Sequence, residues 1–179
     1  KREEFNNSMK NNENKKNNID NYPPVIYYAT RTHSQISNAL NELRKTCYLI
    51  QSTILASRKK GCVNKRVLKS SNIDQACKIE KIKECEYYEK DNLKIKKFDY
   101  KNIDIEDLKS FINEEFKFCP YYYLKNRLEK VDLIFLPYQY LFVEKIRKNL
   151  KLDLNKSILI IDESHNIENV CEEAYSSYL

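Results

Sequence analysis

The 179-residue sequence contains a single glycine, Gly61. Nucleotide-binding α/β proteins usually cradle phosphates in glycine-rich loops, and neither G-x-x-x-x-G-K-[ST] nor G-x-G-x-x-G occurs in this sequence. The scarcity of glycine therefore excludes a phosphate loop of either kind from these residues. If the protein belongs to a nucleotide-driven machine, the phosphate loop must lie outside them.

Long hydrophobic runs are also absent. No segment approaches the roughly 18 apolar residues that a membrane span needs, and the polar start of the chain lacks an apolar signal segment. We therefore expect no membrane partner. The missing signal, and six cysteines without dense pairing, indicate a reducing compartment. Two of these cysteines, Cys47 and Cys171, are expected to pack as small hydrophobes.

Charge and composition set wider limits. Lys and Arg number 32 against 26 Asp and Glu, and the net charge of +6 favours an anionic partner only weakly over an ordinary lysine-rich surface. Residues 1–24 are dominated by Asn and Lys and end in two prolines. Such a segment cannot bury enough apolar surface to offset its ordering entropy, so we predict that it is disordered.

From residue 25 onward, predicted strands and helices alternate. Branched and aromatic residues predict strands at 25–29, 52–57, 131–137 and 157–162. Apolar spacing predicts helices that begin near Gln35 (capped by Ser34), at Pro120, at 138 and at 166. This alternation predicts an α/β fold with a mostly parallel sheet covered on both faces.

One long segment interrupts the alternation. Residues 58–119 hold four of the six cysteines, much charge and no strong strand. We interpret them as an insertion that divides the α/β unit into residues 25–57 and 120–179.

The stretch ILIIDESHNIE (158–168) places polar groups directly after a branched apolar strand. In an open parallel sheet, ligands bind at the carboxyl ends of the strands. Asp162 at such an end could hold Mg²⁺ through water, and Glu163 could orient and deprotonate an attacking water. His165 could face away from the metal, bond a neighbouring motif and report the nucleotide state. The alternative is that Asp162 only caps the following helix.

Several motifs resemble one helicase family. The DESHN box (162–166) resembles the D-E-A-H-N form of motif II in superfamily 2 DNA helicases of the XPD/FANCJ type, with Ser164 in place of alanine. YATRTHSQ (28–35) is similar to motif Ia of these helicases, and residues 119–142 resemble the segment before their motif II. Within the family, TRTHSQ, NELRKT and CEE are most similar to the regulator of telomere elongation subgroup.

The resemblance implies a fold and an activity. The fold would be a partial RecA-like parallel sheet, the first helicase motor domain, with an inserted, mainly helical iron–sulfur domain. The activity would be that of an ATP-dependent 5′–3′ DNA helicase, with Asp162, Glu163 and His165 serving Mg-ATP hydrolysis. Such a helicase would act in the nucleus on single strands, forks and D-loops, in telomere maintenance and DNA repair. Without a phosphate loop, the chain is expected to be a fragment that is inactive alone.

Four cysteines lie in the insertion. Cys62, Cys77, Cys85 and Cys119 are separated by 14, 7 and 33 residues, so the tight pair usual in structural zinc sites is missing. Four thiolates from distant segments can instead hold a [4Fe–4S] cluster. The spacing alone, however, agrees equally well with a metal site and with four free thiols. The resemblance implies that all four are iron–sulfur ligands.

A basic stretch surrounds the first of these cysteines. Residues 57–73 carry six basic residues and no acid, which suits phosphates, although solvated lysines explain the stretch equally well. The resemblance implies that Arg58 supports the cluster and lies near DNA. Tyrosines at 87, 88 and 121–123 could stack on bases, but we expect them to be core residues.

Motif Ia implies a second contact with DNA. In the family this motif grips the backbone of a single strand, and hydroxyls, Arg and amides suit phosphates without reading bases. The residues concerned are Thr30, Arg31, Thr32 and His33. The alternative is a polar loop that caps a helix, with His33 structural.

Two other functions stay open. A non-enzymatic nucleic-acid-binding module with a zinc or iron–sulfur site would account for the missing phosphate loop. It would not account for Asp162, Glu163 and His165 at the end of a strand. A degenerate paralogue kept for protein contacts has only Ser164 in its favour.

Overall fold

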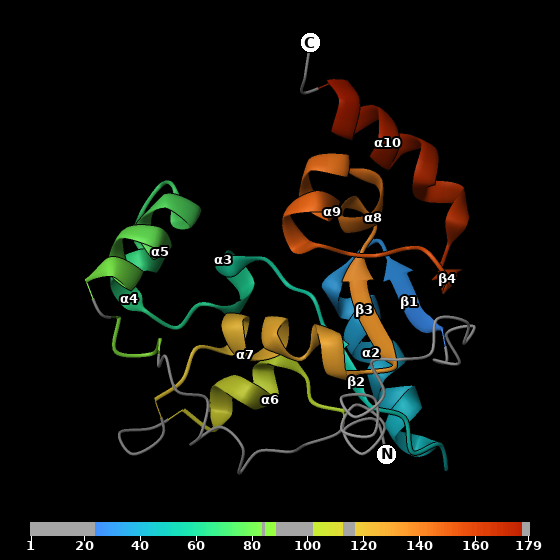
Figure 1. Ribbon diagram of the computed structural model, residues 1–179, viewed down its shortest axis with the longest axis horizontal. Coiled ribbons are helices and arrows are strands. Elements are labelled where there is room, and N and C mark those ends of the chain that lie inside the picture. Colours follow the sequence, from blue (N-terminus) through green and yellow to red (C-terminus); the bar gives the residue numbers. More distant parts are fainter. Residues whose placement is uncertain (1–23, 84, 89–101, 113–116, 177–179) are drawn as a thin grey trace, which may run out of the picture.

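The computed structural model describes residues 24–83, 85–88, 102–112 and 117–176 (Figure 1). The disorder predicted for residues 1–24 falls outside these ranges, apart from Pro24. In the described part of the chain, no helix is long and apolar enough to cross a membrane.

Four parallel strands form the central sheet, in the order β2-β3-β1-β4. They are β1 (Val25–Thr30), β2 (Ser52–Ile54), β3 (Leu133–Pro137) and β4 (Ser157–Ile161). Their branched and aromatic residues suit a pleated, packed surface. The predicted α/β fold with a parallel sheet is therefore confirmed, although the second strand is shorter than expected.

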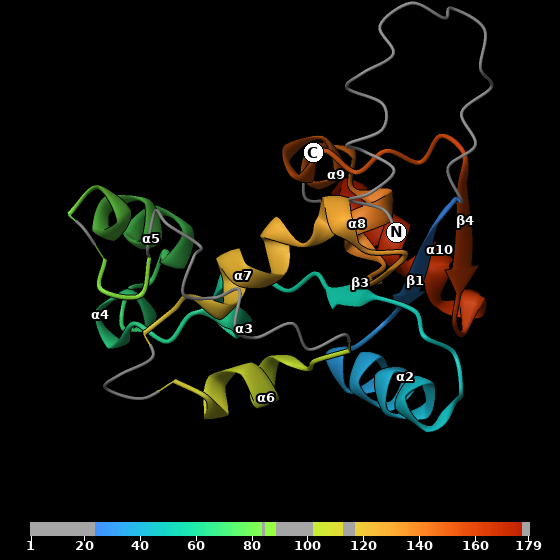
Figure 2. The same ribbon diagram turned by 60° about the horizontal axis from the view of Figure 1, so that its bottom comes forward.

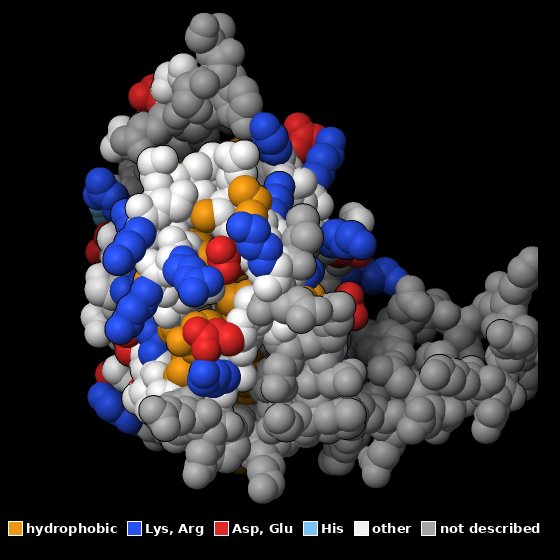
Figure 3. All heavy atoms as spheres, turned by 90° about the vertical axis from the view of Figure 1, so that its left-hand side faces the viewer, with side chains coloured by type: hydrophobic (Ala, Val, Ile, Leu, Met, Phe, Trp, Pro, Cys, Tyr) orange, Lys and Arg blue, Asp and Glu red, His pale blue; other side chains and the backbone are white. Residues whose placement is uncertain are grey.

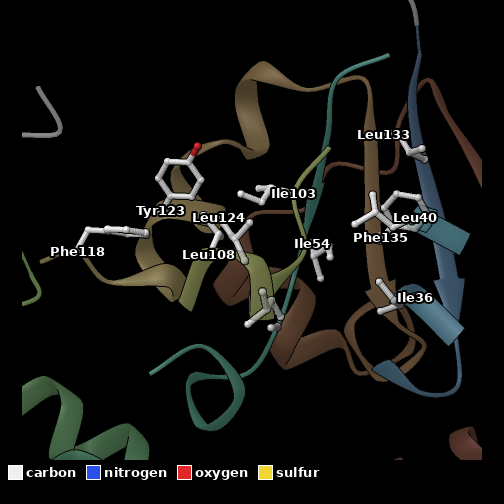
Figure 4. Packing of buried hydrophobic residues seen from close by; sticks show 12 residues of the cluster. Ile36, Leu40, Ile54, Ile103, Leu108, Phe118, Tyr123, Leu124, Leu133 and Phe135 are labelled. Atoms are coloured by element: carbon white, nitrogen blue, oxygen red, sulfur yellow. The ribbon is translucent and has the colours of Figure 1, made fainter. Parts of the chain in front are cut away.

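Helices cover both faces of the sheet, because side chains alternate along each strand. Leu133 and Phe135 face a cluster with α2 (His33–Lys45), α6 (Ile105–Ser110) and α7 (Pro120–Asn126). Figure 4 shows this cluster from close by. The other face packs against α8 (Gln139–Phe142), α9 (Glu144–Leu150) and α10 (Ile167–Ser176), which lie on the opposite side of the strands from α2 in Figure 2.

The residues of the insertion are helical where they are described. Short helices α3 (Arg58–Gly61) and α4 (Lys65–Leu68) precede α5 (Ile73–Ile82), and α4 and α5 stand apart from the sheet on the left of Figure 1. Two short 3₁₀ helices, η2 (Leu128–Lys130) and η3 (Ser164–Asn166), complete the described elements. We call this part of the chain, α3 to α6 with the turn at 85–88 and residues 117–119 before α7, the cysteine lobe.

Two helix predictions are wrong in detail. Thr32 caps α2, not Ser34, because Thr32 has the extended backbone (φ −129°, ψ 155°) of a cap and exchanges hydrogen bonds with Gln35 in a capping box. The helix predicted over 138–150 is split at Val143, whose extended backbone (ψ 102°) separates α8 from α9.

The predicted cover on both faces of the sheet does not extend to β4, so the prediction is wrong for this strand. Ile158, Leu159 and Ile160 are 46%, 45% and 42% exposed. The reason is position, because β4 lies at the edge of the sheet and pairs only with β1 among the described strands. An exposed run of branched residues on an edge strand is a surface that other chain segments can cover.

Candidate functional site

The carboxyl ends of β1, β3 and β4 meet at one edge of the sheet, which we call the carboxyl edge. The backbone N–H of Asp162, directly after β4, donates to the carbonyl of Ala29 at 2.9 Å. The backbone N–H of Tyr138, directly after β3, donates to the carbonyl of Thr30 at 2.9 Å. The DESHN box and the motif Ia loop are thus neighbours at this edge, where parallel sheets bind ligands.

The backbone at Glu163 is strained. This residue has φ 48° and ψ 51°, a left-handed conformation that residues other than glycine seldom adopt. The turn is held by Asn166, whose backbone and side-chain N–H groups donate to the Glu163 carbonyl at 3.1 and 3.3 Å. Asp162 is half-buried, whereas Glu163 and His165 are exposed. Such strain concentrates at functional sites.

Asn166 joins the DESHN box to the motif Ia loop. Its side chain is only 8% exposed, and its Oδ1 accepts from Nη1 of Arg31 at 3.2 Å. Its Nδ2 lies 3.0 Å from Nε2 of His165. Sequence reasoning missed Asn166, although an amide that ends a conspicuous polar run was a visible signal. Arg31, predicted to bind DNA, already contacts the box.

The other motif Ia residues shape the loop. Thr30 is fully buried, and its hydroxyl donates to the carbonyl of Thr32 at 2.8 Å, so no phosphate reaches it in this conformation. Burial, and then the nearby Lys60, lower the pKa of His33, while Asp104 opposes the shift. His33 lines a cleft of about 310 Å³ between the starts of α2 and α6.

The insertion cysteines lie in or beside short helices, and several of their thiols affect one another's pKa. Cys62 ends α3, Cys77 lies in α5, Cys85 follows it, and Cys119 precedes α7. Burial, and then the thiols of Cys77 and Cys85, raise the pKa of Cys62. Burial, and then the thiols of Cys62 and Cys77, raise the pKa of Cys119 to about 12. All four are free thiols.

The structure itself does not test the predicted iron–sulfur ligands. Within the described ranges, no group of three or more His, Cys, Asp or Glu side chains is arranged to hold one metal ion. A cuboidal cluster binds each thiolate at a different iron, so its four ligands do not need to converge on one point. Asn64 also donates from Nδ2 to the Cys85 sulfur at 3.3 Å, a contact that orients this side chain.

Arg58 ties together the helices that carry the cysteines. Its Nη1 lies 2.6 Å from Oδ1 of Asp74 in α5, and its guanidinium stacks 4.7 Å from the ring centre of Tyr121 in α7. Arg58 therefore links α3, α5 and α7, and its side chain is 22% exposed; its predicted support of a cluster and its place near DNA stay predictions.

Further aromatic side chains pack beside the contact between Arg58 and Tyr121. Tyr122 lies 5.0 Å from Tyr121 and 4.7 Å from Tyr88 between ring centres, and Lys81 sits 4.2 Å above the Tyr88 ring. Tyr121 and Tyr123 are buried core residues, as expected, while Tyr88 and Tyr122 are only half-buried. Cys47 is exposed, so its predicted packing as a small hydrophobe is wrong, since it follows the end of α2.

The single glycine lies where α3 meets α7. A Cβ atom at Gly61 would be 2.9 Å from Cβ, 3.0 Å from Cα and 3.1 Å from N of Tyr121. Two of these atoms belong to the backbone, so the added Cβ could be accommodated only if α3 or α7 moved. We expect Gly61→Ala to lower the free energy of unfolding by about 1–3 kcal/mol, measured by urea denaturation of the chain.

The matched control for this prediction is Lys59→Ala, an exposed position of the same helix. In an open helix, Gly→Ala would instead stabilise the protein by about 1 kcal/mol. A Gly61→Ala variant at least as stable as the natural chain would therefore contradict the close contact with Tyr121.

Comparison with known proteins gives consistent matches. The DEAD_2 family model matches residues 28–179. The chain is 38% identical over 161 residues to the regulator of telomere elongation helicase 1 homolog of Drosophila mojavensis, covering 86% of the chain and 16% of that protein. It is 39% identical over 169 residues to the Caenorhabditis elegans homolog, covering 88% and 17%. The chain thus spans less than a fifth of the length of these relatives.

Two solved structures share the fold. An XPD helicase superposes with a TM-score of 0.57 at 28% identity, covering 84% of this chain and 26% of that chain. A truncated XPD superposes with a TM-score of 0.56 at 28% identity, covering 83% and 42%. The sheet described above is therefore that of a RecA-like helicase domain.

Proposed function

Because the chain belongs to the DEAD_2 family, we propose that it is part of the first motor domain of an ATP-dependent iron–sulfur DNA helicase. Residues 25–57 and 120–179 form the motor part, and residues 58–119 form the inserted iron–sulfur domain. The observation that carries the proposal is the carboxyl edge, where Asp162 and the strained Glu163 lie beside the motif Ia loop. The exposed edge of β4 fits a sheet that continues in a longer protein.

In this proposal, ATP with Mg²⁺ binds at the carboxyl edge, and the phosphate loop is supplied by residues outside this chain. The metal, when bound, neutralises charge that develops on the phosphates. Asp162 accepts hydrogen bonds from the water shell of the metal. Glu163 orients the attacking water and takes its proton, and its constrained backbone fixes the direction of the carboxylate.

Hydrolysis and strand binding are coupled through Asn166. Its amide bonds Arg31 of the motif Ia loop and lies against His165 of the box. A DNA phosphate that binds Arg31 therefore acts, through Asn166, on the turn that carries Glu163. Thr32 and the start of α2 supply the hydroxyl and amide groups that phosphates need.

In the cysteine lobe, Cys62, Cys77, Cys85 and Cys119 would hold a [4Fe–4S] cluster. The cluster would tie α3, α5 and α7 together more tightly than their side-chain contacts alone. Lys and Arg side chains gather on the face seen from the side of α4 and α5 (Figure 3). This basic surface favours DNA in a salt-dependent manner.

The biological role that we propose is based on the relatives named above, which are called regulators of telomere elongation. We propose that the longer protein moves 5′ to 3′ on DNA, opens forks and D-loops, and serves telomere maintenance and repair in the nucleus. A non-enzymatic zinc or iron–sulfur module remains the competing function, because the described edge has no phosphate loop of its own.

An ATPase assay separates these two functions. The isolated chain should show no DNA-stimulated phosphate release, because the phosphate-loop lysine and the arginine finger are not among its residues. The longer protein that carries the chain should hydrolyse ATP, faster with single-stranded DNA. Robust hydrolysis by the isolated chain, or none by the longer protein, would contradict the proposed function.

A further inference from the structure

Tyr138 carries a buried hydroxyl without a partner. The side chain is 1% exposed, and its ring packs edge-on against Phe142 at 6.4 Å between centres. Among the described residues, nothing forms a hydrogen bond with its hydroxyl. Nearly all buried polar groups are paired in native structures, because an unpaired buried donor is costly. We therefore expect this hydroxyl to gain a hydrogen-bond partner when the protein binds its ligand.

The backbone of Tyr138 lies at the carboxyl edge, directly after β3. Tyr138 and Asp162 bond the backbone of β1 from opposite sides. Neighbouring strands lie about 4.8 Å apart, so the two backbones are separated by roughly 10 Å, a gap that a tyrosine side chain can largely span. Because Tyr138 and Asp162 are well separated in the sequence, the sequence alone does not show that their backbones flank the same strand.

Four titratable groups face Tyr138. After burial, the carboxylates of Asp162 and Glu163 raise the pKa of Tyr138, with a smaller contribution from Tyr28, while Arg31 lowers it. Asp162 has the largest effect of the four. The phenol is therefore a neutral donor whose electrostatic neighbours include two carboxylates.

We propose that Tyr138 is a positioning residue of the hydrolytic site, and that its hydroxyl donates a hydrogen bond to the Asp162 carboxylate when Mg-ATP is bound. This inference rests on the proposed function. One oxygen of Asp162 then faces the water shell of the metal, and the other is fixed by the phenol. A donor on a rigid strand end holds a carboxylate in one orientation, which is how outer residues strengthen a metal site.

The test compares Tyr138→Phe with Tyr27→Phe. Tyr27 is also buried, but its hydroxyl donates to the Asp153 carbonyl at 3.0 Å, away from the carboxyl edge. In the longer protein, Tyr138→Phe should raise the Mg²⁺ concentration for half-maximal ATP hydrolysis by about 10-fold, and Tyr27→Phe should leave it unchanged. In the isolated chain, Tyr27→Phe should lower the melting temperature by about 2–4 °C, and Tyr138→Phe should not lower it.

The possible outcomes separate the positioning role of Tyr138 from the proposed function. An unchanged Mg²⁺ dependence in Tyr138→Phe, or a loss of stability equal to that of Tyr27→Phe, would overturn the positioning role while leaving the proposed function intact. A natural protein without Mg²⁺-dependent ATP hydrolysis would overturn the proposed function and the inference together.

Discussion

Replacement of Glu163 by glutamine is expected to slow DNA-stimulated ATP hydrolysis by the longer protein by about 10²–10⁴-fold. General-base catalysis contributes a factor of this size, and an amide cannot accept the proton of the attacking water. Glutamine keeps the shape of the side chain, and the left-handed backbone of Glu163 is unaffected by the change. ATP binding should therefore be preserved, so the loss should be confined to kcat.

The matched control is Glu168→Gln, an exposed carboxylate in the first turn of α10. It removes the same charge a few residues further along the chain, where no chemistry is proposed. Phosphate release and nucleotide binding should be measured for both variants. A Glu163→Gln protein that hydrolyses ATP as fast as Glu168→Gln would remove Glu163 from the mechanism.

The second large effect concerns the cysteine lobe. Cys119→Ser is expected to abolish the iron–sulfur cluster and to lower the free energy of unfolding by about 4 kcal/mol or more, because loss of a bound metal group is among the most destabilising single changes. Cys119 is half-buried and directly precedes α7, so a ligand at this position would anchor α7 to the cluster. The links that the cluster makes from α3 and α5 to α7 would then be lost, and only contacts such as those of Arg58 would remain.

Cys47→Ser provides the control, since Cys47 is an exposed free thiol outside the lobe. Urea denaturation of anaerobically purified chains, followed by circular dichroism, measures the difference. Equal stability of the Cys119→Ser and Cys47→Ser chains would mean that residue 119 holds no cluster.

The sequence predicted what depends on local pattern. The runs at 25–29 and 131–137 are strands because branched and aromatic side chains suit a sheet packed on both faces. Even the wrong cap of α2 was a local error, because Thr32 and Ser34 are both good capping residues and only backbone geometry separates them.

The rest depends on the order of strands in space. The exposure of Leu159 follows from the place of β4 at the edge of the sheet, which residue 159 does not encode. The bond between Arg31 and Asn166 joins residues 135 positions apart. The buried hydroxyl of Tyr138 and the tight contact at Gly61 likewise require knowing which elements pack together.

The most direct test of the proposed iron–sulfur helicase lobe is the visible spectrum and metal content of the natural chain purified without oxygen. A cluster held by Cys62, Cys77, Cys85 and Cys119 predicts a brown protein with broad absorption at roughly 400 nm and about four irons per chain. A colourless protein that contains zinc, or no metal, would contradict it.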